Sequence, residues 1–146
     1  MLSIQEVVDN QIAYYHTDNV KELLEYNNIE VYHYHLSNEN DSQMVIQNGL
    51  GNIFIKDDLN PVYENFLLAH ELGHYLLHYD HNIRFQFLAH NYNGKLEREA
   101  NEFACRLLLS DMTLDNDTNI EFIVKEKGIP LKIWYSISER IYFNNI

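Results

Sequence analysis

The stretch His70-Glu71-Leu72-Gly73-His74 decides the fold of this chain. It lies in a segment that opens with Asn60, a cap-type residue, and Pro61, which suits the first helical position, and whose helical pattern continues to about His78. Residues four apart on a helix share a face, with Cβ atoms about 5 to 6 Å apart, so both histidines can bind one zinc ion. Glu71 lies beside this pair, which suits a general base acting on water. The stretch therefore predicts a central helix that carries two zinc ligands and a base.

A third zinc ligand is expected on the next helix, which we predict from Lys95 to Leu109. At about 100° per residue, Glu97 falls on a small and mostly apolar face of that helix, together with Ala100 and Asn101. A carboxylate on such a core-facing stripe is costly unless it is paired or bound to metal. We therefore expect Glu97 to be the third ligand. Asn101 is either a hydrogen-bond partner of a ligand histidine or of the Glu97 carboxylate, or an ordinary surface residue.

The remaining charges of this helix gather on the opposite side. Glu99 and Glu102 lie four residues from the cations Lys95 and Arg106, as i,i+4 pairs. We interpret this side as a solvated face, so Glu99 and Glu102 are not expected to bind the metal.

The sequence also leads to expectations for two other residues of the central helix. Gly73 costs the helix about 1 kcal/mol relative to alanine, which indicates that another element packs closely there. His78 shares the face of His70 and His74, but it lies two turns, about 12 Å, from His70. We expect it to have a structural role or a place at the rim of the site.

The rest of the chain predicts an α+β fold with strands early and helices late. Three stretches rich in β-branched and aromatic residues are expected to form a small antiparallel sheet: Ile29–His35, Met44–Ile46 and Gly51–Ile55. If it is the sheet edge over the cleft, the Gly51–Ile55 strand could hold an extended substrate segment by main-chain pairing. Helical patterns lie on either side, at Ile4–Ile12 and Val20–Leu24 before the sheet and at 119–127 and 131–142 in a helical C-terminal half.

Composition excludes several classes of protein. With 22 acidic and 10 basic side chains, the net charge of −12 argues against direct nucleic-acid binding, which needs clustered Lys and Arg. Apolar runs end long before the roughly 20 residues that cross a membrane. The single Cys105 and a start without a basic segment followed by an apolar one lead us to expect a cytoplasmic protein.

The double motif resembles the ImmA/IrrE family of metallopeptidases. The residues that carry the resemblance are His70 to His74, followed by Glu97-Arg98-Glu99-Ala100-Asn101-Glu102-Phe103-Ala104, and the resemblance covers most of the chain. It implies a gluzincin-like zinc site held by His70, His74 and Glu97, within one zincin-like domain spanning 1–146. Members often continue Ala-x-Leu-Leu-Met-Pro, whereas this chain has Cys105-Arg106-Leu107-Leu108-Leu109-Ser110, which affects only the exit of the second helix.

The resemblance also implies a function. It predicts a regulatory endopeptidase that cleaves a DNA-binding repressor of the helix-turn-helix kind, often encoded by a phage or mobile element, and so relieves repression. In that mechanism Glu71 takes a proton from water and passes it to the leaving amine. The alternative is a zinc-containing antirepressor or protein-binding module that does not cut, although such a module has no need of Glu71.

Overall fold

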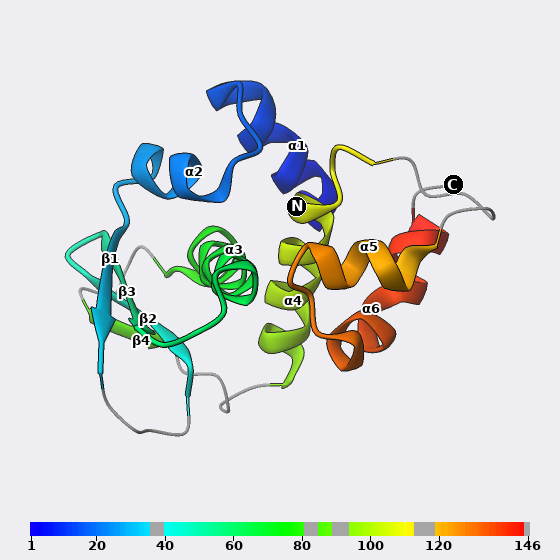
Figure 1. The fold of residues 1–146 in the computed structure, drawn as a ribbon. Helices are drawn as coiled ribbons and strands as arrows, with labels where there is room; N and C mark the ends of the chain where they lie inside the picture. The colour runs from blue at the N-terminus through cyan, green and yellow to red at the C-terminus, as the bar shows by residue number, and fades with distance from the viewer. Residues whose placement is uncertain (36–39, 81–84, 89–93, 113–118, 145–146) are drawn as a thin grey trace.

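The computed structural model describes residues 1–35, 40–80, 85–88, 94–112 and 119–144 (Figure 1). Its helices are α1 (Ile4–Tyr15), α2 (Val20–Tyr26), α3 (Pro61–His78), α4 (Gly94–Leu108), α5 (Ile120–Glu126) and α6 (Leu131–Asn144). Its strands are β1 (Glu30–Tyr34), β2 (Ser42–Gln47), β3 (Leu50–Lys56) and β4 (Phe85–Leu88). The α+β class and the helical C-terminal half are as the sequence predicts.

The four strands form one mixed sheet in the order β1-β3-β2-β4. β3 lies inside the sheet, parallel to β1 and antiparallel to β2, and β4 pairs with the other side of β2. The prediction of a wholly antiparallel sheet is therefore wrong, and the strand around Gly51–Ile55 does not meet the condition of being an edge. The reason is that β3 returns from the β2 hairpin into the space between β1 and β2, while β4 takes the edge beside β2.

The central helix α3 forms where the sequence places it. The Asn60 side chain accepts hydrogen bonds from the backbone N–H groups of Val62 and Tyr63, and Pro61 is the first helical residue. Alternate residues of β2, namely Ser42, Met44 and Ile46, are buried on one face of the sheet. Helix α3 packs against that face, which brings the sheet to one side of the motif.

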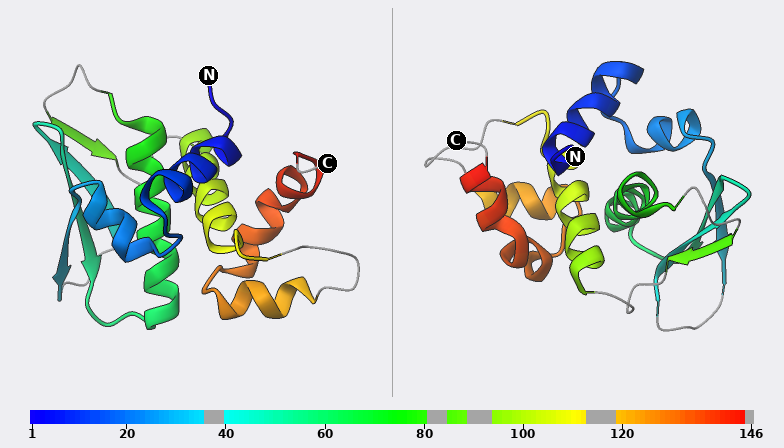
Figure 2. Two further views of the ribbon diagram at one scale, coloured as in Figure 1. Left: turned by 90° about the horizontal axis from the view of Figure 1, so that it is seen from above. Right: turned by 180° about the vertical axis from the view of Figure 1, so that it is seen from behind.

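The elements follow one another across the molecule as sheet, α3, α4 and the α5–α6 pair (Figures 1 and 2). Helix α4 packs against α3 on one side, and it also contacts α1 and α6. Because neighbouring elements surround α4, most of its residues from Ala100 to Leu108 are buried. The pair α3 and α4 therefore forms the middle of the fold.

Burial of α4 corrects the expectation of a solvated face. Glu102 and Arg106 are only 5% and 4% exposed, and the Arg106 Nε atom lies 2.9 Å from Glu102 Oε2. Arg106 also donates to the Gln5 side chain on α1 and to the backbone carbonyl of Arg140 on α6. The i,i+4 pair exists as predicted, but it joins three helices inside the protein because α1 and α6 cover this side of α4.

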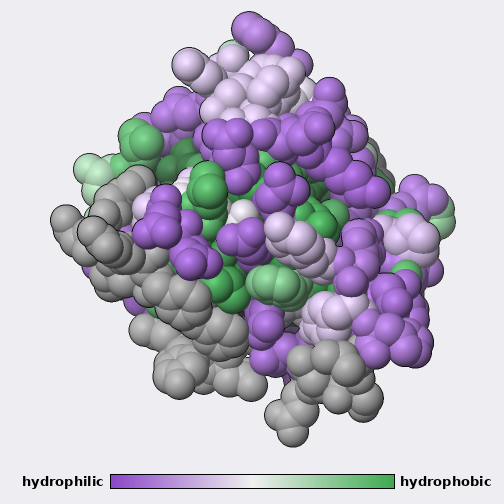
Figure 3. Space-filling view, turned by 90° about the vertical axis from the view of Figure 1, so that its left-hand side faces the viewer, coloured by the Kyte–Doolittle hydropathy of each residue, from purple (hydrophilic) through white to green (hydrophobic). Residues whose placement is uncertain are grey.

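No helix in the described part of the chain combines the length and the apolar character that crossing a bilayer requires. Among the described residues on the side that faces the viewer in Figure 3, hydrophilic ones predominate, with hydrophobic ones scattered between them.

Candidate metal centre

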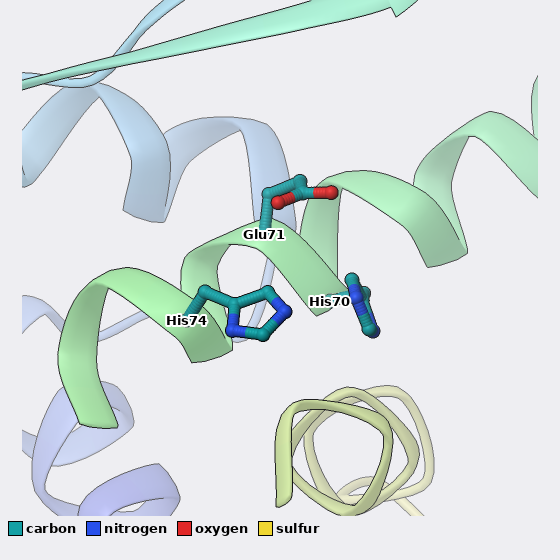
Figure 4. Close-up of side chains that lie close together, drawn as sticks. All are labelled: His70, Glu71 and His74. Carbon is teal, nitrogen blue, oxygen red and sulfur yellow. The ribbon is translucent and has the colours of Figure 1, made fainter. Parts of the chain in front are cut away.

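Helix α3 presents the three motif residues on two sides. The His70 and His74 rings project on the side where α4 passes, while the Glu71 side chain leaves the helix towards the sheet (Figure 4). All three residues are at most 3% exposed. One potential ligand atom from each lies within 4.8 Å of those of the other two, so the three side chains could meet at one metal ion. The spacing seen in the sequence thus becomes a buried cluster.

Helix α4 brings Glu97 to both histidines. Its Oε1 atom lies 2.7 Å from His74 Nε2, and its Oε2 atom lies 3.3 Å from His70 Nε2. The Glu97 carboxylate therefore lies between the same nitrogen of each ring, as expected for a residue on the core-facing stripe of α4. Glu99 and Glu102 have no such contact with His70 or His74 among the hydrogen bonds and ion pairs described for these residues.

Asn101 lies one turn beyond Glu97 on α4 and contacts the far side of the His70 ring. Its Oδ1 atom is 2.7 Å from His70 Nδ1. An amide oxygen only accepts, so His70 Nδ1 donates in this contact, and Nε2, which lies on the Glu97 side, is the ring nitrogen left to bind a metal. Of the two alternatives left open by the sequence, the structure therefore shows Asn101 as a partner of His70.

His78 has a contact that the sequence analysis missed. Its Nδ1 atom lies 2.9 Å from His74 Nδ1, and its Nε2 atom lies 3.3 Å from Glu99 Oε1. Burial and the neighbouring His74 lower the pKa of the His78 imidazole, while Glu99 acts in the opposite direction. The i,i+4 spacing of His74 and His78 could have indicated this contact, because it is the same spacing that joins His70 and His74.

Ser42 is a second residue that the sequence did not indicate. It opens β2, is fully buried, and donates a hydrogen bond of 2.7 Å from its hydroxyl to Glu71 Oε2. This bond holds the carboxyl group of Glu71 against the sheet, and thereby fixes its side-chain orientation. No local pattern could have found Ser42, because its place depends on how the sheet sits on α3.

A cavity of about 170 Å³ borders His70 and Glu97. Phe66, Leu67 and Ile133 supply apolar parts of its wall. At its polar side, Tyr63 donates a hydrogen bond to Asp41, and burial followed by this bond raises the pKa of the Tyr63 hydroxyl to about 12. The candidate metal-binding residues therefore have a small and partly apolar space next to them.

The donor set of His70, His74 and Glu97 fits zinc. Two imidazole nitrogens and one carboxylate are ligand types that Zn²⁺ takes, and three protein ligands leave a position for water or substrate, as in catalytic rather than structural sites. Because His70 Nδ1 contacts the Asn101 oxygen, Nε2 is the His70 ring nitrogen that could bind a metal. His70, His74 and Glu97 would hold the ion.

Comparison with known proteins gives the class to which this site belongs. Residues 24–126 match the peptidase M78 family, described as the IrrE N-terminal-like domain. Because the match covers most of the chain, including α3 and α4, the chain belongs to this metallopeptidase family, as the resemblance to ImmA/IrrE proteins predicts.

One relative of this chain is a phage protein. The chain is 33% identical over 135 residues to a protein of Bacillus phage phi105 named uncharacterized immunity region protein 2, and the alignment covers 89% of this chain and 85% of the relative. No solved structure matches the chain significantly.

Proposed function

We propose that this chain is a cytoplasmic zinc-dependent endopeptidase, formed by one zincin-like domain, which cuts a specific DNA-binding regulator. The observation that carries the proposal is the Glu97 carboxylate, which lies 2.7 Å and 3.3 Å from the Nε2 atoms of His74 and His70. A purely structural role for these three residues would not require Glu71 beside them. Membership of a metallopeptidase family supports the same activity.

The roles of the residues follow from their chemistry. His70, His74 and Glu97 hold zinc, which when bound polarises the scissile carbonyl and makes water easier to deprotonate. Glu71 accepts the proton of the attacking water and delivers it to the leaving amine. Ser42 orients the Glu71 carboxyl group through its 2.7 Å hydrogen bond, and Asn101 orients the His70 ring.

The cavity beside the cluster supports a peptide substrate. Its apolar wall at Phe66, Leu67 and Ile133 suits an apolar side chain next to the scissile bond, because a pocket of this kind gains from removing apolar surface from water. The cavity also opens beside His70 and Glu97, so a side chain placed there would bring its own backbone close to the proposed metal.

The substrate we propose is a helix-turn-helix repressor of a phage or mobile element. Two observations support this choice. The relative from phage phi105 is named as an immunity region protein, which fits a role in phage regulation. The chain itself has a net charge of −12, which favours association with a basic DNA-binding protein and disfavours contact with DNA.

Incubating the zinc-loaded protein with the repressor encoded beside its gene tests this function. We expect discrete fragments from the wild type, none after chelation, and none from Glu71→Gln, which keeps its zinc because it loses only the base. Glu97→Ala should weaken zinc binding at least tenfold, whereas Glu139→Ala, at an exposed position on α6, should not.

The alternative function is a zinc-containing antirepressor that sequesters the repressor without cutting it. It would be favoured by a stable complex, intact repressor and full activity of Glu71→Gln in relieving repression. Equal zinc affinity in Glu97→Ala and Glu139→Ala would show instead that the ligand set is wrong.

A further inference from the structure

We propose that His78 and Glu99 are positioning residues, which hold the His74 ring in the tautomer and orientation that metal binding needs. This inference rests on the proposed function, because it assigns a role towards the zinc ion. The inference assigns a role to two side chains, His78 and Glu99, that have none in the proposed mechanism.

Four groups form one continuous line through the site. Glu97 Oε1 lies 2.7 Å from His74 Nε2, His74 Nδ1 lies 2.9 Å from His78 Nδ1, and His78 Nε2 lies 3.3 Å from Glu99 Oε1. The line begins on α4, crosses two residues of α3 and returns to α4. The His78 side chain is 6% exposed and that of Glu99 is 31% exposed, so the line runs from the buried cluster towards the surface.

The chemistry of these groups decides where the protons lie when a metal is bound. A nitrogen that binds a metal must offer its lone pair, so the single proton of the His74 ring must be on Nδ1. His74 Nδ1 then donates, and the nitrogen that faces it, His78 Nδ1, must accept. A neutral His78 ring that accepts at Nδ1 carries its proton on Nε2.

Glu99 selects this arrangement over the opposite one. A carboxylate oxygen only accepts hydrogen bonds, so Glu99 favours the His78 tautomer with its proton on Nε2. That tautomer leaves the Nδ1 lone pair facing His74 and so favours a His74 proton on Nδ1. Glu97 Oε1, 2.7 Å from His74 Nε2, also only accepts and favours the opposite His74 tautomer. Support from His78 therefore matters when a metal takes the Nε2 lone pair, because His74 must then carry its proton on Nδ1. The carboxylate thus acts on the ligand through an intervening imidazole.

The two ligand histidines are supported in different ways. His70 Nδ1 contacts an amide oxygen directly, because Asn101 lies 2.7 Å away on α4. His74 is one turn further along α3, and His78 and Glu99 together supply the acceptor there. The comparison suggests a substitution: an asparagine at position 78 places an oxygen where the histidine has Nδ1, so it can accept from His74 as Asn101 accepts from His70.

The test measures zinc affinity, with a competing chromophoric chelator, in the full-length protein. His78→Leu should bind zinc 10 to 100 times more weakly than the wild type, since it removes the acceptor. His78→Asn should stay within about threefold of the wild type because it restores one. His33→Leu is the matched control: it removes a His–Glu contact of similar length, with Nε2 3.2 Å from Glu64 Oε1, on an exposed part of β1, and it should leave zinc affinity unchanged.

A second measurement reports the tautomers themselves. In zinc-loaded protein labelled with ¹⁵N-histidine, the ring nitrogen shifts should place the His78 proton on Nε2. Glu99→Ala changes a partly exposed side chain and should fold normally; we expect a mixture of His78 tautomers and a zinc affinity several-fold lower. Thermal unfolding of the metal-free variants shows whether each remains folded.

The outcomes separate this inference from the proposed function. Wild-type zinc affinity in His78→Leu, equal losses in His78→Leu and His78→Asn, or a proton on His78 Nδ1 in the loaded wild type would each overturn the inference and leave the zinc site standing. A wild-type chain that binds no zinc would overturn both. If His78→Leu does not fold, His78→Asn and Glu99→Ala still decide the result.

Discussion

At the scale of single residues, the contact between Ser42 and Glu71 makes a prediction. Ser42→Ala removes the hydroxyl donor from a fully buried carboxyl group, so the free energy of unfolding should fall by about 1 to 3 kcal/mol. The proposed base also loses its fixed orientation, and repressor cleavage should slow roughly tenfold, which corresponds to about 1.4 kcal/mol of barrier. Zinc affinity should not change. Urea unfolding, cleavage rate and zinc titration check these three points, with the exposed Ser136→Ala as the control. A Ser42→Ala variant as stable and active as the control would contradict the prediction.

The sequence predicted those side-chain contacts that depend on one helix or one helix face. His70, Glu71 and His74 meet because a single helix spaces them, and Glu97 and Asn101 follow from the core-facing stripe of the next helix. The contact of Ser42 with Glu71 depends on how β2 lies on α3. The contact of His78 with Glu99 depends on how α3 crosses α4. No short spacing in the chain contains that information.

At the scale of elements, Gly73 controls how closely α4 approaches α3. A Cβ atom at position 73 would lie 3.0 Å from Phe103 Cδ1 and 3.2 Å from the backbone oxygen of Ala100. Alanine improves helix propensity by about 1 kcal/mol, but overpacking of a buried contact costs about 1 to 3 kcal/mol. We therefore expect Gly73→Ala to lower the free energy of unfolding by about 1 kcal/mol and to weaken zinc binding, because α4 must shift and it carries Glu97.

Gly94→Ala, whose Cβ would meet nothing within 4 Å, is the control and should change neither the free energy of unfolding nor the zinc affinity. Denaturant titration and zinc affinity test both variants, and an unchanged Gly73→Ala would show that the helices tolerate the extra methyl group.

The surroundings of α4 mark a limit of sequence analysis at this scale. The spacing of Glu102 and Arg106 predicted their pairing correctly, but not its burial. An i,i+4 pair of opposite charges is typical of an exposed face, and nothing within α4 shows that α1 and α6 cover this side. Burial becomes tolerable because Arg106 also donates to Gln5 and to the carbonyl of Arg140, so that each nitrogen of its guanidinium group has an acceptor.

At the scale of the whole molecule, local patterns found most elements but not how the strands are arranged. The start of α3 was predicted from its cap and proline, its end from the helical pattern, and three of the four strands were recognised from their composition. The parallel pairing of β1 with β3 was missed because neighbours in a sheet need not follow one another in the chain. β4 was missed because four residues are too few for alternation to be recognised.

The proposed zinc ion would join the two helices at the centre of the fold, so its removal should affect the stability of the whole protein. A ligand that binds only the folded state at 100 times its Kd stabilises that state by about 2.7 kcal/mol. For a domain of this size, this corresponds to a Tm higher by roughly 5 to 10 °C.

We expect chelation to lower the Tm of the wild type by that amount and to leave the Tm of Glu97→Ala almost unchanged, because the variant lacks the ligand from α4. Calorimetry with zinc and with chelator measures both proteins. If the Tm of the wild type does not change on chelation, α3 and α4 are held together by packing alone, and no metal links His70, His74 and Glu97.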